Sequence, residues 1–115
     1  MANKTDLGAV QIKNEVIGTI ASLAAQEVHG VAGIWRPFPQ RFFLRNSGVQ
    51  MEIREQDVRI WLSLIAQYGA DLPVVAALVQ DHVREMIDRM THLNAVEVNV
   101  SIHHVKMKHR GGGVR

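Results

Sequence analysis

Three of the chain's six histidines fall in the stretch "SIHHVKMKHR", residues 101–110, beside two lysines and an arginine. Imidazole nitrogens are common zinc ligands, so the stretch raises the question of a metal site. Side chains alternate across a strand, however, so His103 and His104 would point to opposite faces and could not both reach one ion. The remaining histidines show no zinc-ligand spacing such as H-x-x-x-H. We therefore expect no metal site.

The hydrophobic phase of this stretch indicates an irregular strand instead. Apolar residues alternate up to Ile102, and the apolar character then moves to the other phase at Val105 and Met107. A shift of one residue is what a β-bulge produces, so His103 and His104 mark either a bulge or the end of the strand. If the strand continues, Val105 and Met107 should be partly covered. If it ends, the whole segment is available to an anionic partner.

A second segment with chemical potential is "WRPFPQRFFLRN", residues 35–46, which combines four aromatic residues, three arginines and two prolines with no acid. One interpretation is that Phe42, Phe43 and Leu44 fold back as a lid over the core. The other is an exposed apolar and cationic loop that docks on an anionic lipid surface or on a partner's acidic groove. The sequence leaves both open. The candidate contact residues, with the basic tail as a secondary contact, are Trp35, Arg36, Arg41, Phe42, Phe43, Arg45, Lys106, Lys108 and Arg110.

Motifs for catalysis are missing from the sequence. There is no cysteine, which excludes thiolate zinc sites and thiol catalysis, and no serine lies in a G-x-S-x-G turn. No glycine-rich loop that could cradle a phosphate is present. We expect a protein that is not an enzyme and needs no cofactor.

The tetrapeptide "GVAG", residues 30–33, matches the G-x-x-G loop of KH modules, which bind the RNA backbone. Here the motif runs from a predicted helix into a predicted strand and contains no basic residue. RNA binding on a KH-like α+β frame is therefore kept as the alternative function, with nucleic acid the less favoured partner.

Composition indicates one soluble domain. The 115 residues carry a net charge of +2, but seven of the thirteen basic residues lie in residues 36–45 and 106–115, so the rest of the chain is acidic. No apolar run is long enough for a membrane span, and no signal peptide is recognisable. We expect a cytoplasmic protein with a single domain at residues 1–110 and a flexible glycine-rich tail at residues 111–115.

Hydrophobic periodicity predicts the elements. A strand at "GAVQI" precedes an amphipathic helix over residues 14–29, a short strand at "VAGIW", and a hairpin over residues 48–68 that turns at "EQD". A second helix begins at "DLPV", capped by Asp71, and a strand at "AVEVNVSI" closes the chain. The fold class is α+β: a mostly antiparallel sheet with two amphipathic helices on one face, in the order β-α-β-β-β-α-β.

These segments resemble the alkaline shock protein family of bacterial envelope stress proteins. The matching features are the "GAV-I" strand, the "A-x-E-V-x-G-V" helix end, the "V-I-L-L-x-x-x-Y-G" strand, the Pro73 helix start and the closing "V-x-V-N-V" strand. The chain departs from the family pattern "T-G-L" at His92, where glycine would relax a left-handed helix cap. The aromatic and arginine segment lies where the family varies, so its use cannot be inherited.

The resemblance implies a non-enzymatic cytoplasmic envelope stress response protein. We expect it to act as an adaptor or scaffold at the inner face of the membrane, with a protein partner that is itself membrane-anchored. Peripheral contact with anionic lipid and self-association through an exposed sheet edge are further expectations.

Overall fold

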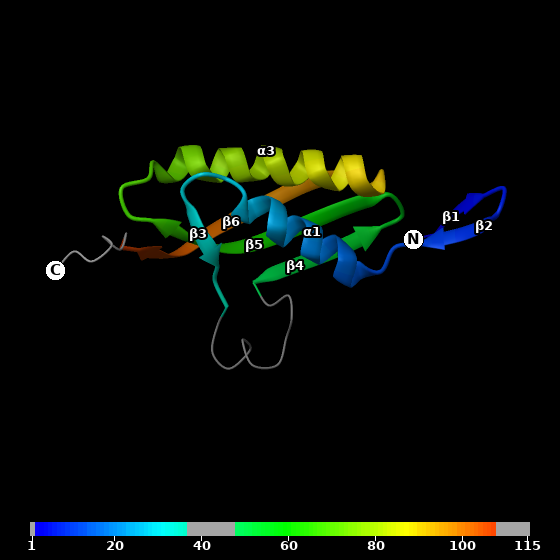
Figure 1. Cartoon of the computed structure of the whole chain (residues 1–115), viewed down its shortest axis with the longest axis horizontal. Coiled ribbons are helices and arrows are strands. Elements are labelled where there is room, and N and C mark those ends of the chain that lie inside the picture. The colour runs from blue at the N-terminus through cyan, green and yellow to red at the C-terminus, as the bar shows by residue number, and fades with distance from the viewer. Residues whose placement is uncertain (1, 37–47, 108–115) are drawn as a thin grey trace.

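A computed structural model describes residues 2–36 and 48–107 (Figure 1). Within these ranges the chain forms two helices and a mostly antiparallel sheet, so the predicted α+β class is confirmed, with one additional strand at the amino end. The elements in chain order are β1 (Ala2–Thr5), β2 (Gly8–Gln11), α1 (Asn14–Gln26), β3 (Val31–Ile34), β4 (Val49–Arg54), β5 (Asp57–Gln67), α3 (Leu72–Thr91) and β6 (Asn94–Lys106).

Strand β5 is the centre of the main sheet. It pairs antiparallel with β3 and β4 along one side and parallel with β6 along the other. The predicted alternation holds over its whole length, since the core-facing residues Val58, Ile60, Leu62, Leu64 and Ala66 are at most 1% exposed. The predicted hairpin is β4–β5, which turns at Glu55 and Gln56.

Strands β3 and β4 lie end to end along the same side of β5. The backbone N–H of Trp35 donates to the carbonyl of Ser63 at 2.9 Å, and the N–H of Ser63 donates to the carbonyl of Gly48 at 2.8 Å. Trp35 and Gly48 therefore meet opposite the same residue of β5. The two strands form a single interrupted edge.

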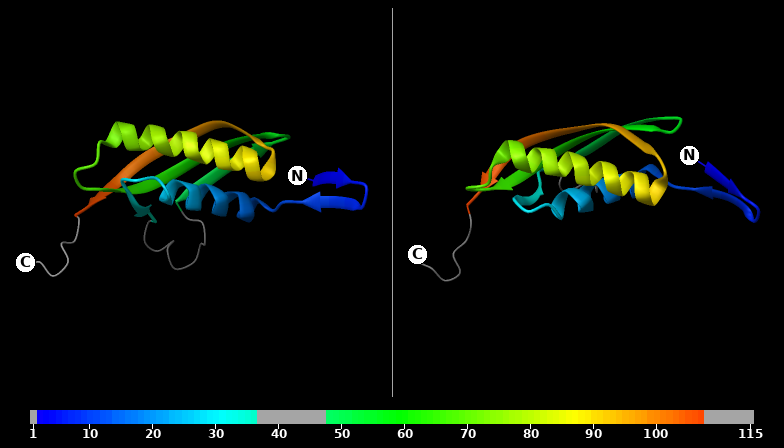
Figure 2. Two further views of the ribbon diagram at one scale, coloured as in Figure 1. Left: turned by 45° about the horizontal axis from the view of Figure 1, so that its top comes forward. Right: turned by 90° about the horizontal axis from the view of Figure 1, so that it is seen from above.

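Both helices cover one face of the sheet, and no helix of the described residues covers the other face (Figure 2). Core positions of α1 include Ile17, Ala21 and Ala24, and those of α3 are Val75, Val79, Val83 and Ile87. The predicted apolar stripes are wider than the buried ones. Four apolar residues of the two helices are between 47% and 57% exposed: Val16, Leu23, Leu78 and Met90. They lie at the outer side of the helix layer, where the described part of the chain offers no further element to pack against.

The ends of α3 follow the predicted capping chemistry. The Asp71 carboxylate accepts from the N–H of Val74 at 3.4 Å, and Pro73 lies in the first turn. At the other end His92 adopts the left-handed conformation, with φ 61° and ψ 20°. No helix in the described ranges is long and apolar enough to cross a membrane.

Replacement of His92 by glycine should stabilise the protein. A left-handed conformation is disfavoured for any residue with a Cβ, and glycine at a helix end removes that cost. We expect His92→Gly to raise the free energy of unfolding by about 0.5–1 kcal/mol in urea denaturation. His92→Ala, which keeps the Cβ, is the control and should give no increase. A glycine variant no more stable than the alanine variant would contradict this account.

Candidate functional site

The face of the main sheet that neither described helix covers is the most distinctive surface of the described residues. Along β5 the residues that alternate with the core are Arg59, Trp61, Ser63, Ile65 and Gln67. Trp61 is 40% exposed, and Ile65 is half-buried although no helix of the described ranges covers it. The open sheet face, as we call this surface, thus carries large apolar side chains at positions where a solvated sheet would carry polar ones.

A bulge in β6 brings a histidine onto this face. Leu64 of β5 pairs with Ile102, and the next residue, Ile65, pairs with His104, so His103 is the extra residue. Of the two alternatives predicted from the phase shift, a bulge or the end of the strand, the structure shows the bulge. The strand then continues to Lys106, and Val105 is 37% exposed while Met107, just beyond its end, is 66% exposed.

The extra residue of the bulge stacks on Trp35. The ring centroids of Trp35 and His103 are 4.3 Å apart and the ring planes differ by 12°. Trp35 directly follows β3 and is hydrogen-bonded to Ser63 on one side of β5, whereas His103 belongs to β6 on the other side. The stack therefore joins the two edges of the sheet across its centre.

Three of the predicted contact residues lie within the described ranges. Trp35 is half-buried in the stack, and Arg36 and Lys106 are exposed. Trp35 directly precedes Arg36, and His103 lies three residues before Lys106. The stack therefore brings together the starts of the two basic segments, residues 36–45 and 106–115. The other predicted residues, and the predicted tail at 111–115, fall outside the described residues: Arg41, Phe42, Phe43, Arg45, Lys108 and Arg110.

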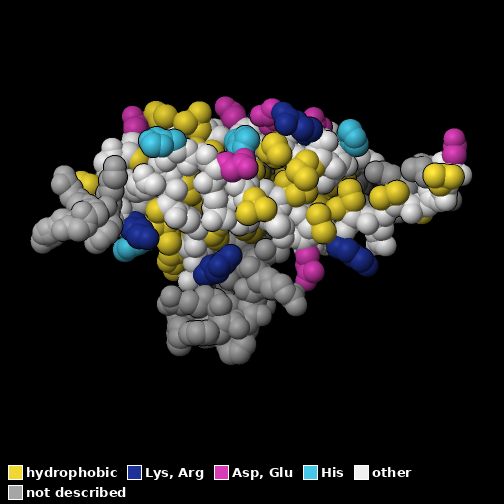
Figure 3. Space-filling view, viewed as in Figure 1, with side chains coloured by type: hydrophobic (Ala, Val, Ile, Leu, Met, Phe, Trp, Pro, Cys, Tyr) yellow, Lys and Arg dark blue, Asp and Glu magenta, His cyan; other side chains and the backbone are white. Residues whose placement is uncertain are grey.

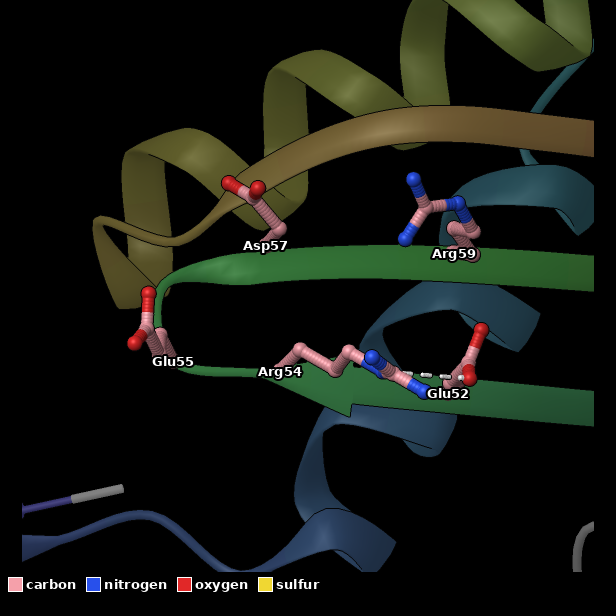
Figure 4. Close-up of a pocket in the computed structure, with 5 residues that line it drawn as sticks. All are labelled: Glu52, Arg54, Glu55, Asp57 and Arg59. Atoms are coloured by element: carbon pink, nitrogen blue, oxygen red, sulfur yellow. Dashed lines mark ion pairs between the residues drawn. The ribbon is translucent and has the colours of Figure 1, made fainter.

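The opposite end of the open face is a shallow depression with charges of both signs (Figure 4). Arg54 pairs with Glu52 at 3.4 Å across solvent-exposed surface, and Arg59 pairs with Glu97 of β6 at 3.2 Å. Glu55 and Asp57 complete the rim, so carboxylates outnumber guanidinium groups. These exposed pairs contribute little to stability. Their position makes one half of the face acidic.

Several functional features were missed from the sequence alone. The stacking partner of Trp35 could not be predicted, because it depends on which strand lies beside β5. Trp61 and Ile65, in contrast, carried a signal: both are large apolar residues in the phase opposite to the core residues of the same strand. Such a strand is apolar on both faces, which indicates that both faces contact something.

The sequence raised two other possible sites, a metal site and a KH-type RNA-binding loop. Within residues 2–36 and 48–107 no three histidine, aspartate or glutamate side chains lie close enough together to hold a metal ion. The "GVAG" motif lies almost entirely in β3, which is hydrogen-bonded to β5. It is therefore not the loop between two helices that a KH module uses.

The described residues define a class: a two-layer α+β module with an open sheet face. Family comparison then gives the particular family. The model of the alkaline shock protein 23 family, described as having a cell envelope-related function, matches residues 2–107, and the chain belongs to this family. This confirms the resemblance seen in the sequence motifs.

Two curated relatives are bacterial proteins. The chain is 36% identical over 104 residues to the uncharacterised protein YqhY of Bacillus subtilis strain 168, covering 85% of this chain and 77% of that one. It is 28% identical over 108 residues to a stress response regulator gls24 homolog of Streptococcus pyogenes serotype M1, covering 88% of this chain and 60% of that one. It thus spans less than two thirds of the streptococcal relative.

Among solved structures, a double variant of the MamM CTD has the same fold. It aligns with a TM-score of 0.59 at 17% sequence identity and covers 83% of this chain and 86% of that one. At this level of identity the likeness concerns the fold alone.

A methyl group added at Gly48, where β4 follows β3 along the edge of the sheet, should destabilise the protein. Gly48 and Gly69 have φ of 96° and 93°, so alanine is strained at both. At Gly48 a Cβ would also meet the Trp35 carbonyl oxygen and, at 2.6 Å, Cγ2 of Ile34, whereas at Gly69 it would meet nothing within 4 Å. Gly69→Ala is therefore a matched control.

We expect Gly69→Ala to lower the free energy of unfolding by about 1–2 kcal/mol, the cost of the backbone strain alone. Gly48→Ala should cost about 1–3 kcal/mol more, because the close approach adds overpacking. Urea titrations of both variants measure the difference. Equal losses would mean that Trp35 and Gly48 are not held together as described.

Proposed function

We propose that this chain is a non-enzymatic adaptor in the envelope stress response, and that the open sheet face around the Trp35–His103 stack contacts an anionic surface at the inner face of the membrane. Membership of a family with a cell envelope-related function and the relative named as a stress response regulator support the cellular role. The observation that carries the site is the stack itself, which lies on a face that no described helix covers and joins the origins of both basic segments.

The aromatic content of the face favours an interface. Trp35 and Trp61 are rigid, amphipathic rings, which bury much area at a small loss of conformational entropy and are enriched in contact surfaces and at membrane interfaces. Trp61 lies on the central β5, and Trp35 directly follows β3 and is hydrogen-bonded to β5 through its backbone. The surface is therefore formed before it meets its target.

The charge of the face selects an anionic target. Residues 28–36, 61–70 and 98–107, which make up the half of the face around the stack, contain no aspartate or glutamate. The same half presents the exposed Arg36 and Lys106. Each basic residue near an anionic membrane contributes about 1 kcal/mol, and salt weakens that contribution.

Vesicle sedimentation tests this surface. The protein should sediment with phosphatidylglycerol vesicles and remain in the supernatant with phosphatidylcholine vesicles. Replacing both Arg36 and Lys106 by glutamine should remove about 2 kcal/mol, or about 20- to 30-fold in affinity. Trp35→Ser should weaken binding further, since it removes the ring and the stack.

The matched control is the pair Arg54→Gln and Arg59→Gln, which removes the same charge from the acidic half of the same face. Its effect should be at least several-fold smaller than that of the first pair. Equal losses of affinity would show that the net charge of the protein, and not this surface, attracts it to the vesicles. Negligible sedimentation of the unmodified protein with both vesicle types would exclude the lipid contact.

A second candidate function is binding of single-stranded RNA on the open sheet face. The observation in its favour is that aromatic rings on an uncovered antiparallel sheet are used by some RNA-binding modules to stack bases. A mixed single-stranded RNA should then bind at low salt and lose affinity with Trp61→Ala. An unchanged RNA mobility at low salt would eliminate this candidate.

A further inference from the structure

The amino-terminal hairpin is built as a projecting arm. Strands β1 and β2 form a separate two-stranded sheet, in which Ala2 pairs with Gln11 and Thr5 with Gly8. Figures 1 and 2 show it extending beyond the start of α1, away from the main sheet. Leu7 at its turn is fully exposed, Val10 is 49% exposed, and all of β2 is exposed.

Such an arm is not stable by itself. An isolated two-stranded hairpin is marginal in water, and independent stability needs a third strand or an apolar surface to pack against. The arm also exposes the apolar side chains of Leu7 and Val10, which gain free energy when they are covered. A surface that accepts the hairpin is therefore expected.

The helix layer offers an apolar surface of the right kind. Val16 and Leu23 of α1 and Met90 of α3 are 47%, 57% and 55% exposed, and Ile12 and Met86 are partly buried and pack against the core. Figure 3 shows apolar side chains in a band that runs from the hairpin across α1 towards α3. We call these five residues the apolar band; three of them, Val16, Leu23 and Met90, are outer helix positions that the core leaves exposed.

The free edge of β6 is a poorer acceptor. Its carbonyls at Ala95 and Val98 accept hydrogen bonds from side chains of α3, at 3.2 Å from Arg84 Nε and 3.0 Å from Gln80 Nε2. Bulges at Val96 and His103 interrupt the strand further. Covered carbonyls and bulges are known means of blocking edge-to-edge pairing. The β6 edge is therefore disfavoured for the self-association that we expected at a sheet edge.

We infer that the hairpin of one copy packs on the apolar band of a second copy, in a reciprocal, two-fold exchange of arms. Ile12 connects the hairpin to α1 of the same copy and packs against the core. The hairpin therefore extends beyond the start of that helix and does not lie along it. At about 3.4 Å per strand residue and 1.5 Å per helix residue, the hairpin is about 13 Å long and α1 about 20 Å. When the α1 helices of the two copies lie antiparallel, the hairpin of each copy lies along α1 of the other copy.

This arrangement makes specific pairs. Val10 of one copy lies near Leu23 of the second copy, and Val16 lies near its own counterpart at the two-fold axis. A two-fold interface uses the same surface patch on both copies, so the assembly closes as a dimer. The interface lies on the helix side of the molecule and leaves the open sheet face uncovered.

Disulfide cross-linking can test the pairing cleanly, because the chain contains no cysteine. Chains with Val10→Cys and chains with Leu23→Cys, distinguished by tags of different size, are mixed and oxidised gently. We expect a mixed disulfide of the two chains on a non-reducing gel, and a homodimeric disulfide for Val16→Cys. All three positions are exposed, so circular dichroism should show an unchanged fold.

Gln50→Cys, exposed on the open sheet face, is the control and should give at least ten-fold less mixed disulfide with Val10→Cys. Equal yields with Gln50→Cys and Leu23→Cys would overturn the inference. So would an intrachain disulfide in the double variant Val10→Cys and Leu23→Cys, since the hairpin would then cover its own helix.

Sedimentation velocity supplies an independent measurement on the complete chain. The unmodified protein should sediment as a dimer, and Val10→Ser combined with Leu23→Ser should shift it to a monomer. Trp35→Ser should leave the dimer intact, which separates this inference from the proposed membrane contact. A monomeric unmodified protein at concentrations of about 100 μM would overturn the inference, whatever the vesicle experiments show.

Discussion

Pairing of β5 on both sides is the constraint on which the rest of the described structure depends. Strands β3, β4 and β6 are each hydrogen-bonded to β5. The core-facing side chains of β5 form the surface on which both helices pack. An eleven-residue strand with an unbroken alternation of buried aliphatic residues can adopt only one register, because a slip of one residue would expose the whole row. The positions of Trp35 and His103 follow from this, since each is held by a segment paired to β5.

Local features of the fold were predictable because their causes are local. The alternation in β5, the turn at Glu55 and Gln56, and the capping of α3 by Asp71 depend on residues within a few positions of one another. The irregularity at His103 and His104 was also predicted, as either a bulge or a strand end, because a phase shift is visible in a single strand. The stack on Trp35 was not, because it requires β6 to pass beside β5 in parallel after α3, a pairing between segments about forty residues apart. The exposure of Leu23 and Met90 could not be predicted for a related reason: a stripe of apolar residues does not reveal how many layers cover it.

One-sided covering of the sheet gives the described part of the molecule two unlike surfaces. The helix side carries an apolar band left over from incomplete packing, and the open sheet face carries aromatic rings with a gradient of charge from acidic at the β4–β5 turn to basic at the stack. Surfaces of such different chemistry suit different targets, and they lie on opposite sides of a sheet that is one layer thick. The two proposed contacts therefore do not compete for the same surface.

The interruption of the edge strand opposite Ser63 has a consequence for how such a module can diversify. Because Trp35 and Gly48 occupy neighbouring positions on the same residue of β5, the length of chain between them does not affect the register of β3 or β4. Lengthening a closed loop costs only about 0.6 kcal/mol for each doubling. Foreign peptides, or a whole folded domain whose termini lie close together, could therefore be grafted between these two residues with little change in the sheet, next to the aromatic stack.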